Sequence, residues 1–228
     1  MIFKGKLPIY LFSLKEISDT FKKAISRRGL EISKKKEKLK LNYFEPFNSY
    51  IELEKIKLDP EGKLIIRKLS DMVDVFQDKE AAKETLKENP IIYKFYNVRI
   101  PEEDGHLQHC ISIIFSGKIG NEYYMTKGHF HKIKDTAEVY LTLKGRGKLV
   151  MQTPDQKSKV LDMREGSISY IPPYWAHRTV NTGEEPLIIF CIYRGDAGHN
   201  YGIIEKKGMT TLVLEKNEEV VLEGNPHY

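Results

Sequence analysis

The 228-residue sequence predicts an all-β protein, built as a β-sandwich or barrel. From residue 91 onward, short strand-like runs follow one another closely, with Gly, Pro, Asn and Asp turns but no helical pattern between them. The composition of 40% hydrophobic, 11% aromatic and 30% charged residues excludes a collagen-like or wholly disordered chain. The predicted strands span residues 91–99, 109–116, 121–126, 137–143, 147–152, 158–162, 167–171, 187–193 and 210–214.

The net charge of +5 is unevenly distributed along the chain. Residues 1–41 contain 12 basic and 4 acidic side chains, which gives them +8, whereas the remaining 187 residues carry −3. Apolar residues at helical spacing predict an amphipathic helix from about Ser13 to Arg28, and a solvated basic run follows it. We therefore expect a basic extension over residues 1–41, helical and then flexible, before a single domain over residues 42–228. Because the basic excess lies in the extension, the charge does not indicate nucleic-acid binding.

The segment before the predicted strands contains two short helical signals. Ser70 has the chemistry of an N-cap for a turn that begins at Asp71. Residues 78–88 are rich in Ala, Glu, Lys and Leu, and Pro90 follows them, which predicts a short helix with a stop signal. These helices are expected at the periphery of the β domain.

The two cysteines, Cys110 and Cys191, lie far apart in the sequence, and each is part of an apolar stretch. This pattern is typical of buried thiols in a reducing compartment. No apolar run approaches the roughly 18–20 residues that cross a bilayer. The short apolar stretch near the N-terminus has neither the length nor the cleavage site of a signal peptide. We expect a cytoplasmic protein with no membrane partner.

Three histidines and one glutamate form a candidate metal site. His129 and His131 are two residues apart, so on a strand both imidazoles project from the same face. Glu138 begins the next predicted strand, and an adjacent antiparallel strand would point its carboxylate to the same place. His177 follows 39 residues later, after the Pro172-Pro173 turn. Three imidazoles and a carboxylate suit a divalent transition metal, without selecting among Fe, Ni, Zn, Cu and Mn.

Longer motifs around these residues resemble a known family. The run Gly128-His129-Phe130-His131, followed by Glu138 and Gly145, resembles the first cupin motif, and Gly166, Pro172, His177 and Asn181 resemble the second. Two departures mark a variant: six residues separate His131 from Glu138, and Tyr174 stands where the second motif usually has Gly. The sequence of this variant closely resembles the archaeal, cupin-type glucose-6-phosphate isomerases from about Tyr43 to the C-terminus. The most similar runs are residues 126–131, 170–181 and 196–202.

The resemblance implies a cupin double-stranded β-helix, or jelly-roll barrel, and a metal-dependent isomerase. Its reaction would interconvert glucose 6-phosphate and fructose 6-phosphate in glycolysis and gluconeogenesis. One divalent metal per subunit would be held by His129, His131, Glu138 and His177, with Fe²⁺ expected first and Ni²⁺, Zn²⁺ or Mn²⁺ as alternatives. The resemblance also implies a homodimer.

The same resemblance assigns further residues of the site. The phosphate end of the substrate would be lined by Ser112, Thr126, Gly128, Tyr193 and Tyr201. The sugar end would be lined by Tyr93, Tyr140 and His199, of which Tyr140 and His199 join Glu138 as catalytic candidates. Glu138 is either the fourth metal ligand or the base that moves a proton between C1 and C2 of the open-chain sugar, and a hydride shift is the alternative route.

Two other functions remain compatible with the ligand set. The first is another metal-dependent cupin enzyme such as an oxygenase, and the second is a cupin that binds sugar phosphate without turnover. The segment from Thr126 to Gly128 favours the isomerase, because it offers a hydroxyl and an approachable backbone N–H to a phosphate.

Overall fold

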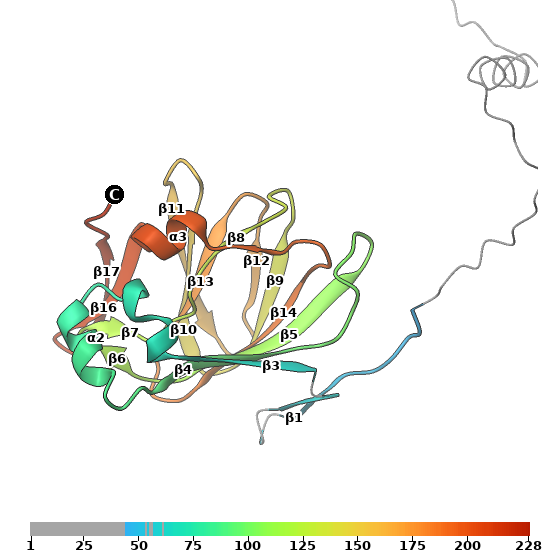
Figure 1. Cartoon of the computed structure of the whole chain (residues 1–228), viewed down its shortest axis with the longest axis horizontal. Coiled ribbons are helices and arrows are strands. Elements are labelled where there is room, and N and C mark those ends of the chain that lie inside the picture. The colour runs from blue at the N-terminus through green and yellow to red at the C-terminus, as the bar shows by residue number, and fades with distance from the viewer. Residues whose placement is uncertain (1–43, 53, 55–56, 61) are drawn as a thin grey trace, which may run out of the picture. The chain divides into compact units, whose positions relative to one another are not determined.

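The computed structural model describes residues 44–228, except residues 53, 55–56 and 61 (Figure 1). The helix predicted from Ser13 to Arg28 and the extension over residues 1–41 lie outside the described residues. The chain divides into two compact units, of which the second, Asn48–Tyr228, contains all the strands described below.

The larger sheet of this unit is antiparallel and has the strand order β12-β9-β14-β5-β4-β3. β-branched and aromatic residues dominate its central strands, as expected for strands that pack on both faces. The bounds of its strands are β3 (Lys63–Lys68), β4 (Ile91–Asn97), β5 (Leu107–Ile114), β9 (Glu138–Lys144), β12 (Ile168–Ile171) and β14 (Leu187–Arg194).

The facing sheet contains β11 (Ser158–Arg164), β10 (Arg146–Gln152) and β13 (Ala176–Asn181), paired in that order. Residues 124–129 continue it along the free side of β13, through the bridges Met125–Val180 and His129–His177. The short strand β8 (Phe130–His131) follows directly and pairs with β15 (His199–Asn200). Figure 1 shows the two sheets facing each other around an interior that opens beside β8.

Side chains that alternate inward from both sheets form the main core. Because successive side chains of a strand point to opposite faces, inward positions on β5, β9 and β14 face the inward positions on β10 and β13. Fully buried members of this core include Ile114, Leu149, Ile171, Ala176 and Leu187. The arrangement is the jelly-roll barrel that the resemblance predicts, so the predicted cupin fold class is confirmed.

A second, smaller core lies on the outer face of the larger sheet. It contains Tyr96, Ile111, Ile113 and Ile188, and Leu58 of the hairpin of β1 (Tyr50–Glu52) and β2 (Lys57–Asp59) belongs to it.

The remaining elements lie at the rim of the barrel. They are the 3-10 turns η1 (Leu69–Asp71) and η2 (Val73–Val75), the helices α2 (Lys79–Thr85) and α3 (Gly202–Lys207), and the strands β6 (Lys118–Ile119), β7 (Glu122–Tyr123), β16 (Thr211–Lys216) and β17 (Glu219–Gly224). The predicted short helix is present as α2, and Asp78 caps it by accepting a hydrogen bond from the Ala81 N–H.

Two local predictions are wrong. Ser70 lies inside η1 and is not an N-cap, because the turn begins one residue earlier and Lys68 occupies the cap position. Glu138 does not lie on a strand adjacent to β8, since β8 pairs with β15 while β9 belongs to the larger sheet. The long turn between His131 and Glu138 carries the chain from one sheet to the other, so the carboxylate meets the histidines from across the barrel.

Among the described residues, no helix is long and apolar enough to cross a membrane.

Tyr174 occupies a backbone conformation that normally requires glycine. Its φ of 70° lies in the left-handed region, where a side chain costs about 1–2 kcal/mol, and its N–H donates to the Lys134 carbonyl, which fixes the turn before His177. We expect Tyr174→Gly to leave the free energy of unfolding unchanged or to raise it by up to about 1 kcal/mol, measured by urea denaturation.

The matched control is Tyr170→Gly. Tyr170 on β12 is equally exposed, at 57% against 55% for Tyr174, but its backbone is ordinary strand. Glycine there should lower the free energy of unfolding by about 0.5–1 kcal/mol. Equal losses at both positions would show that the left-handed turn carries no strain.

Candidate active site

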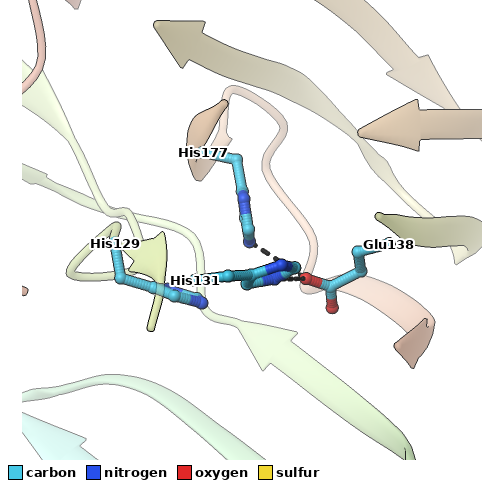
Figure 2. A group of neighbouring side chains, drawn as sticks. All are labelled: His129, His131, Glu138 and His177. Atoms are coloured by element: carbon cyan, nitrogen blue, oxygen red, sulfur yellow. Dashed lines mark hydrogen bonds and ion pairs between the residues drawn. The ribbon is translucent and has the colours of Figure 1, made fainter. Parts of the chain in front are cut away.

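Four side chains of the predicted metal site converge inside the barrel. One ligand atom from each of His129, His131, Glu138 and His177 lies within 4.8 Å of the others. Figure 2 shows the imidazoles of His131 and His177 directed toward the Glu138 carboxylate, with His129 beside them. Oε2 of Glu138 lies 3.1 Å from Nε2 of His131 and 3.1 Å from Nε2 of His177.

Backbone pairing fixes the two outer histidines of this cluster. The His129 N–H donates to the His177 carbonyl at 3.2 Å, and the His177 N–H donates to the His129 carbonyl at 3.1 Å. Residues paired in this way project their side chains to the same face of the sheet, and the two imidazole centroids lie 4.5 Å apart. Strand pairing thus brings together two histidines that are 48 positions apart in the sequence.

Thr136 orients the third histidine. The Thr136 hydroxyl donates to the Ile133 carbonyl at 2.7 Å, so its oxygen accepts from Nδ1 of His131, which is also 2.7 Å away. The proton of this imidazole is therefore on Nδ1, and Nε2 presents a lone pair to the centre of the cluster. Such a hydrogen bond from the distal nitrogen is typical of a metal-binding histidine.

The donor set fits a divalent cation. His177 is 2% exposed, and within the described part of the chain neither of its ring nitrogens has a hydrogen-bond partner. Its Nε2 is near Glu138 Oε2, but without the alignment of a hydrogen bond. Buried polar atoms are rarely left unpaired, so these nitrogens indicate a missing electrophile at the centre. The His/Glu cluster could hold a metal ion.

The protonation states agree with this interpretation. Burial alone would raise the pKa of Glu138, but its contacts with His131 and His177 outweigh burial and lower the pKa to about 2. Burial and the neighbouring imidazoles hold the pKa of His129 well below its usual value. At neutral pH an ionised carboxylate therefore faces a neutral His129, and both are in the form that binds metals.

A cavity of about 70 Å³ opens from the cluster and brings most of the predicted substrate residues together. Ser112 and Tyr193 reach it from the larger sheet, and Thr126 reaches it from the segment along β13. Its lining residues are Tyr93, Phe95, Cys110, Ser112, Thr126, His129, Glu138, Tyr140, His177, Cys191, Tyr193, His199 and Tyr201. Phe95 and the two buried cysteines were not among the predicted site residues, because only the sheet register shows that they face inward.

His199 and Tyr201 approach the cluster from the pair β8–β15. His199 lies opposite His131 in this pair, with its ring 4.4 Å from that of His129 and stacked on Tyr201 at 6.0 Å. His199 is more accessible than the other histidines of the cavity because it faces the opening. The surrounding protein still desolvates it, and this lowers the pKa of its imidazole.

Three tyrosine hydroxyls in the cavity stay protonated at neutral pH. Burial, followed by the Glu138 charge, raises the pKa of Tyr140 well above its usual value, and burial also raises the pKa of Tyr193. Burial and Tyr201 raise the pKa of Tyr93 to about 12, although the backbone of Lys127 and the side chain of Arg67 partly offset them. All three can donate a hydrogen bond to a bound oxyanion or hydroxyl.

The segment from Thr126 to Gly128 is held from behind by a buried arginine. Arg178 is 2% exposed and donates to the Lys127 carbonyl through Nε at 3.3 Å and Nη2 at 2.6 Å. Lys127 itself forms an ion pair with Glu205 of α3 at 2.9 Å, so it is not a freely solvated charge. Gly128 has no part in the cavity lining but is packed against Arg178, a residue that sequence reasoning missed although it directly follows His177.

Comparison with known proteins identifies related chains. A family model described as Glucose-6-phosphate isomerase (GPI) matches residues 66–228. The glucose-6-phosphate isomerase of Thermococcus onnurineus is 43% identical over 188 residues, which cover 82% of this chain and 99% of that protein. The glucose-6-phosphate isomerases of Pyrococcus abyssi and Pyrococcus furiosus are 46% and 44% identical, covering 74% and 82% of this chain and 90% and 98% of their own length.

Solved structures of oxalate decarboxylase also match. The enzyme of Lactobacillus farciminis has a TM-score of 0.38 and 18% identity, over 48% of this chain and 30% of that chain. No functional conclusion follows from a likeness at this level.

Gly128 is required by both its backbone and its surroundings. Its φ is +75°, and a Cβ there would lie 3.1 Å from both Cβ and Nε of Arg178 and 3.3 Å from the His177 carbonyl oxygen. We expect Gly128→Ala to lower the free energy of unfolding by about 2–5 kcal/mol, since an unfavourable backbone conformation adds to overpacking.

Gly166→Ala is the matched control, because Gly166 has a φ of +79° and nothing within 4 Å of an added Cβ. It should show only the backbone cost of about 1–2 kcal/mol. If chemical denaturation gives the same loss for both variants, the close approach of Arg178 to residue 128 is not a constraint.

Proposed function

The chain belongs to the glucose-6-phosphate isomerase family, and from this premise we propose a metal-dependent isomerase that interconverts glucose 6-phosphate and fructose 6-phosphate. The observation that carries the metal dependence is the convergence of His129, His131, Glu138 and His177 within 4.8 Å at the base of a cavity lined by hydroxyl groups.

The metal would be held by the three imidazoles and the Glu138 carboxylate, one ion per subunit. When bound, a divalent cation supplies Lewis-acid polarisation of a sugar carbonyl and stabilises negative charge on neighbouring oxygens. The donor set accepts several ions, and we propose Fe²⁺ first, with Ni²⁺, Zn²⁺ or Mn²⁺ as alternatives.

Glu138 has two proposed roles. It is a ligand in the resting site, and its carboxylate also lies where a base could accept a proton from C1 or C2 of the open-chain sugar and return it to the neighbouring carbon. His199 would exchange a proton with the ring oxygen or anomeric hydroxyl during ring opening, because it is the accessible imidazole of the cavity. Tyr140, on the same face of β9 as Glu138, would donate a hydrogen bond to a sugar oxygen.

The phosphate end of the substrate would lie against hydroxyl and backbone donors. Ser112, Thr126, Tyr193 and Tyr201 line the cavity together, which supports this assignment, and Tyr93 completes the wall beside them. Gly128 contributes by letting the backbone turn next to Arg178, which keeps the segment with Thr126 in place.

Further properties are proposed from weaker support. A homodimer is supported by exposed apolar side chains on the outer face of the larger sheet, namely Leu64, Ile66, Ile168, Tyr170 and Ile192. Two buried free thiols are compatible with a cytoplasmic location. The reaction would serve glycolysis and gluconeogenesis, and the division into an extension over residues 1–41 and a catalytic domain over residues 42–228 stays a prediction.

Isomerase activity is tested by converting fructose 6-phosphate to glucose 6-phosphate, coupled to NADP⁺ reduction by glucose-6-phosphate dehydrogenase. The metal-loaded protein should turn over, and EDTA should lower its kcat/KM by about 100-fold or more, because the lost charge stabilisation amounts to several kcal/mol. Re-addition of Fe²⁺, Ni²⁺, Zn²⁺ or Mn²⁺ should restore activity. A metal-loaded protein without turnover, or oxygen uptake with an enediol substrate, would contradict the isomerase.

Two ligand variants separate metal binding from catalysis. His177→Ala should lose metal and activity together, with metal affinity reduced by more than about 100-fold, whereas the exposed His227→Ala should change neither. Glu138→Gln keeps an oxygen donor but cannot act as a base, so it should retain much of the metal while kcat falls by about 10²–10⁴-fold.

Product formed in D₂O should carry deuterium at the exchanged carbon if Glu138 moves a proton. Full metal content in His177→Ala would remove His177 from the ligand set. Unchanged turnover in Glu138→Gln would exclude the base role.

A further inference from the structure

A second, outer cavity of about 370 Å³ adjoins the cavity at the metal cluster. The two cavities share four lining residues: Phe95, Tyr193, His199 and Tyr201. Sites for small molecules usually measure about 300–1,000 Å³, so the inner cavity of about 70 Å³ is too small to hold a sugar phosphate alone. A substrate whose reacting carbons face the cluster must extend toward the outer cavity.

Arg67 lies in the wall of this outer cavity. It is opposite Tyr93 in the pairing of β3 with β4, and Tyr93 faces the inner cavity, so the side chain of Arg67 projects to the inner face of the sheet. Its guanidinium is close enough to the Tyr93 hydroxyl to lower the pKa of that group, partly offsetting burial. The backbone of Lys127, next to Thr126, interacts with the same hydroxyl. Arg67 is thus at the end of the cavity where the phosphate donors gather.

The charge of Arg67 is unmatched within the described part of the chain. No carboxylate there forms an ion pair with it, and its Nε is buried without a hydrogen-bond partner. The other cations around the site are already engaged. Lys127 pairs with Glu205, Arg178 donates to the Lys127 carbonyl, and Arg194 forms a two-point pair with Asp196.

A buried donor without a partner is costly, and evolution rarely leaves one next to a binding cavity unless a ligand completes it. A guanidinium presents a planar fork of donors that matches two oxygens of a phosphate. Because the tyrosine hydroxyls and backbone N–H groups nearby are neutral, they cannot by themselves compensate the charge of a phosphate dianion.

We infer that Arg67 is a substrate-binding residue that receives the phosphate group of the sugar phosphate at the junction of the two cavities. The inference rests on the proposed isomerase function for the identity of the substrate, and on the geometry alone for the anion. Binding of the phosphate would satisfy Nε of Arg67 and orient the sugar so that C1 and C2 face the metal cluster.

The test compares the full-length, metal-loaded chain with Arg67→Gln, Arg67→Lys and Lys63→Gln. Lys63 is the matched control, because it lies on the same face of β3 and lines the same cavity, but is exposed. We expect Arg67→Gln to raise KM for fructose 6-phosphate at least about tenfold while kcat changes little, since the interaction is equal in the ground and transition states. Arg67→Lys should recover part of the loss, and Lys63→Gln should change KM less than about threefold.

A second measurement does not depend on turnover. Inorganic phosphate is titrated into each variant by calorimetry, before and after EDTA treatment so that binding to the metal is separated from binding to the protein. Arg67→Gln should weaken phosphate binding by the same factor as KM, at an unchanged thermal unfolding midpoint. Phosphate binding as tight as in the unmodified chain, or an equal loss in Lys63→Gln, would overturn the inference. A chain that binds phosphate through Arg67 but does not isomerise would contradict the proposed function and support the anion receptor.

Discussion

The site depends on one electrostatic constraint, which is an ionised carboxylate and three imidazoles enclosed at the centre of a barrel. Glu138 and His177 are nearly inaccessible to water, and burial of a charge is unfavourable unless a partner compensates it. A divalent cation would satisfy the carboxylate and the unpaired nitrogens of His177 together. The jelly roll meets this constraint by supplying His129 and His177 from one paired backbone bridge and Glu138 from the opposite sheet.

The sequence predicts the barrel and the donor set well, because both depend on local signals. Turn residues bracket the strands, and His129, His131 and Glu138 lie within ten positions of one another. The strand β13 was not predicted, because its run from Ala176 to Asn181 contains His, Arg, Thr and Asn, which are buried by tertiary packing instead of by their own hydrophobicity. The location of Glu138 across the barrel could not be read either, since strand order is a long-range property.

Charge arithmetic alone gives an incomplete picture of how an anion would be held. The body of the chain after residue 41 is slightly acidic, so its sequence indicates hydroxyls, backbone donors and a metal as the phosphate receptor. The structure adds a single cation, Arg67, whose position facing the cavity follows only from the pairing of β3 with β4. A buried guanidinium in a low-dielectric wall acts more strongly on an anion than several exposed lysines would.

The central claim, that the cluster of His129, His131, Glu138 and His177 holds the metal, is tested most directly by anomalous diffraction. Crystals of the full-length protein loaded with Zn²⁺ or Mn²⁺ would be measured above and below the absorption edge of the metal. The account predicts one anomalous peak per subunit, about 2.0–2.3 Å from a nitrogen of each histidine and from a carboxylate oxygen of Glu138. A fully loaded protein whose peak lies elsewhere, or lacks two or more of these ligands, would contradict it.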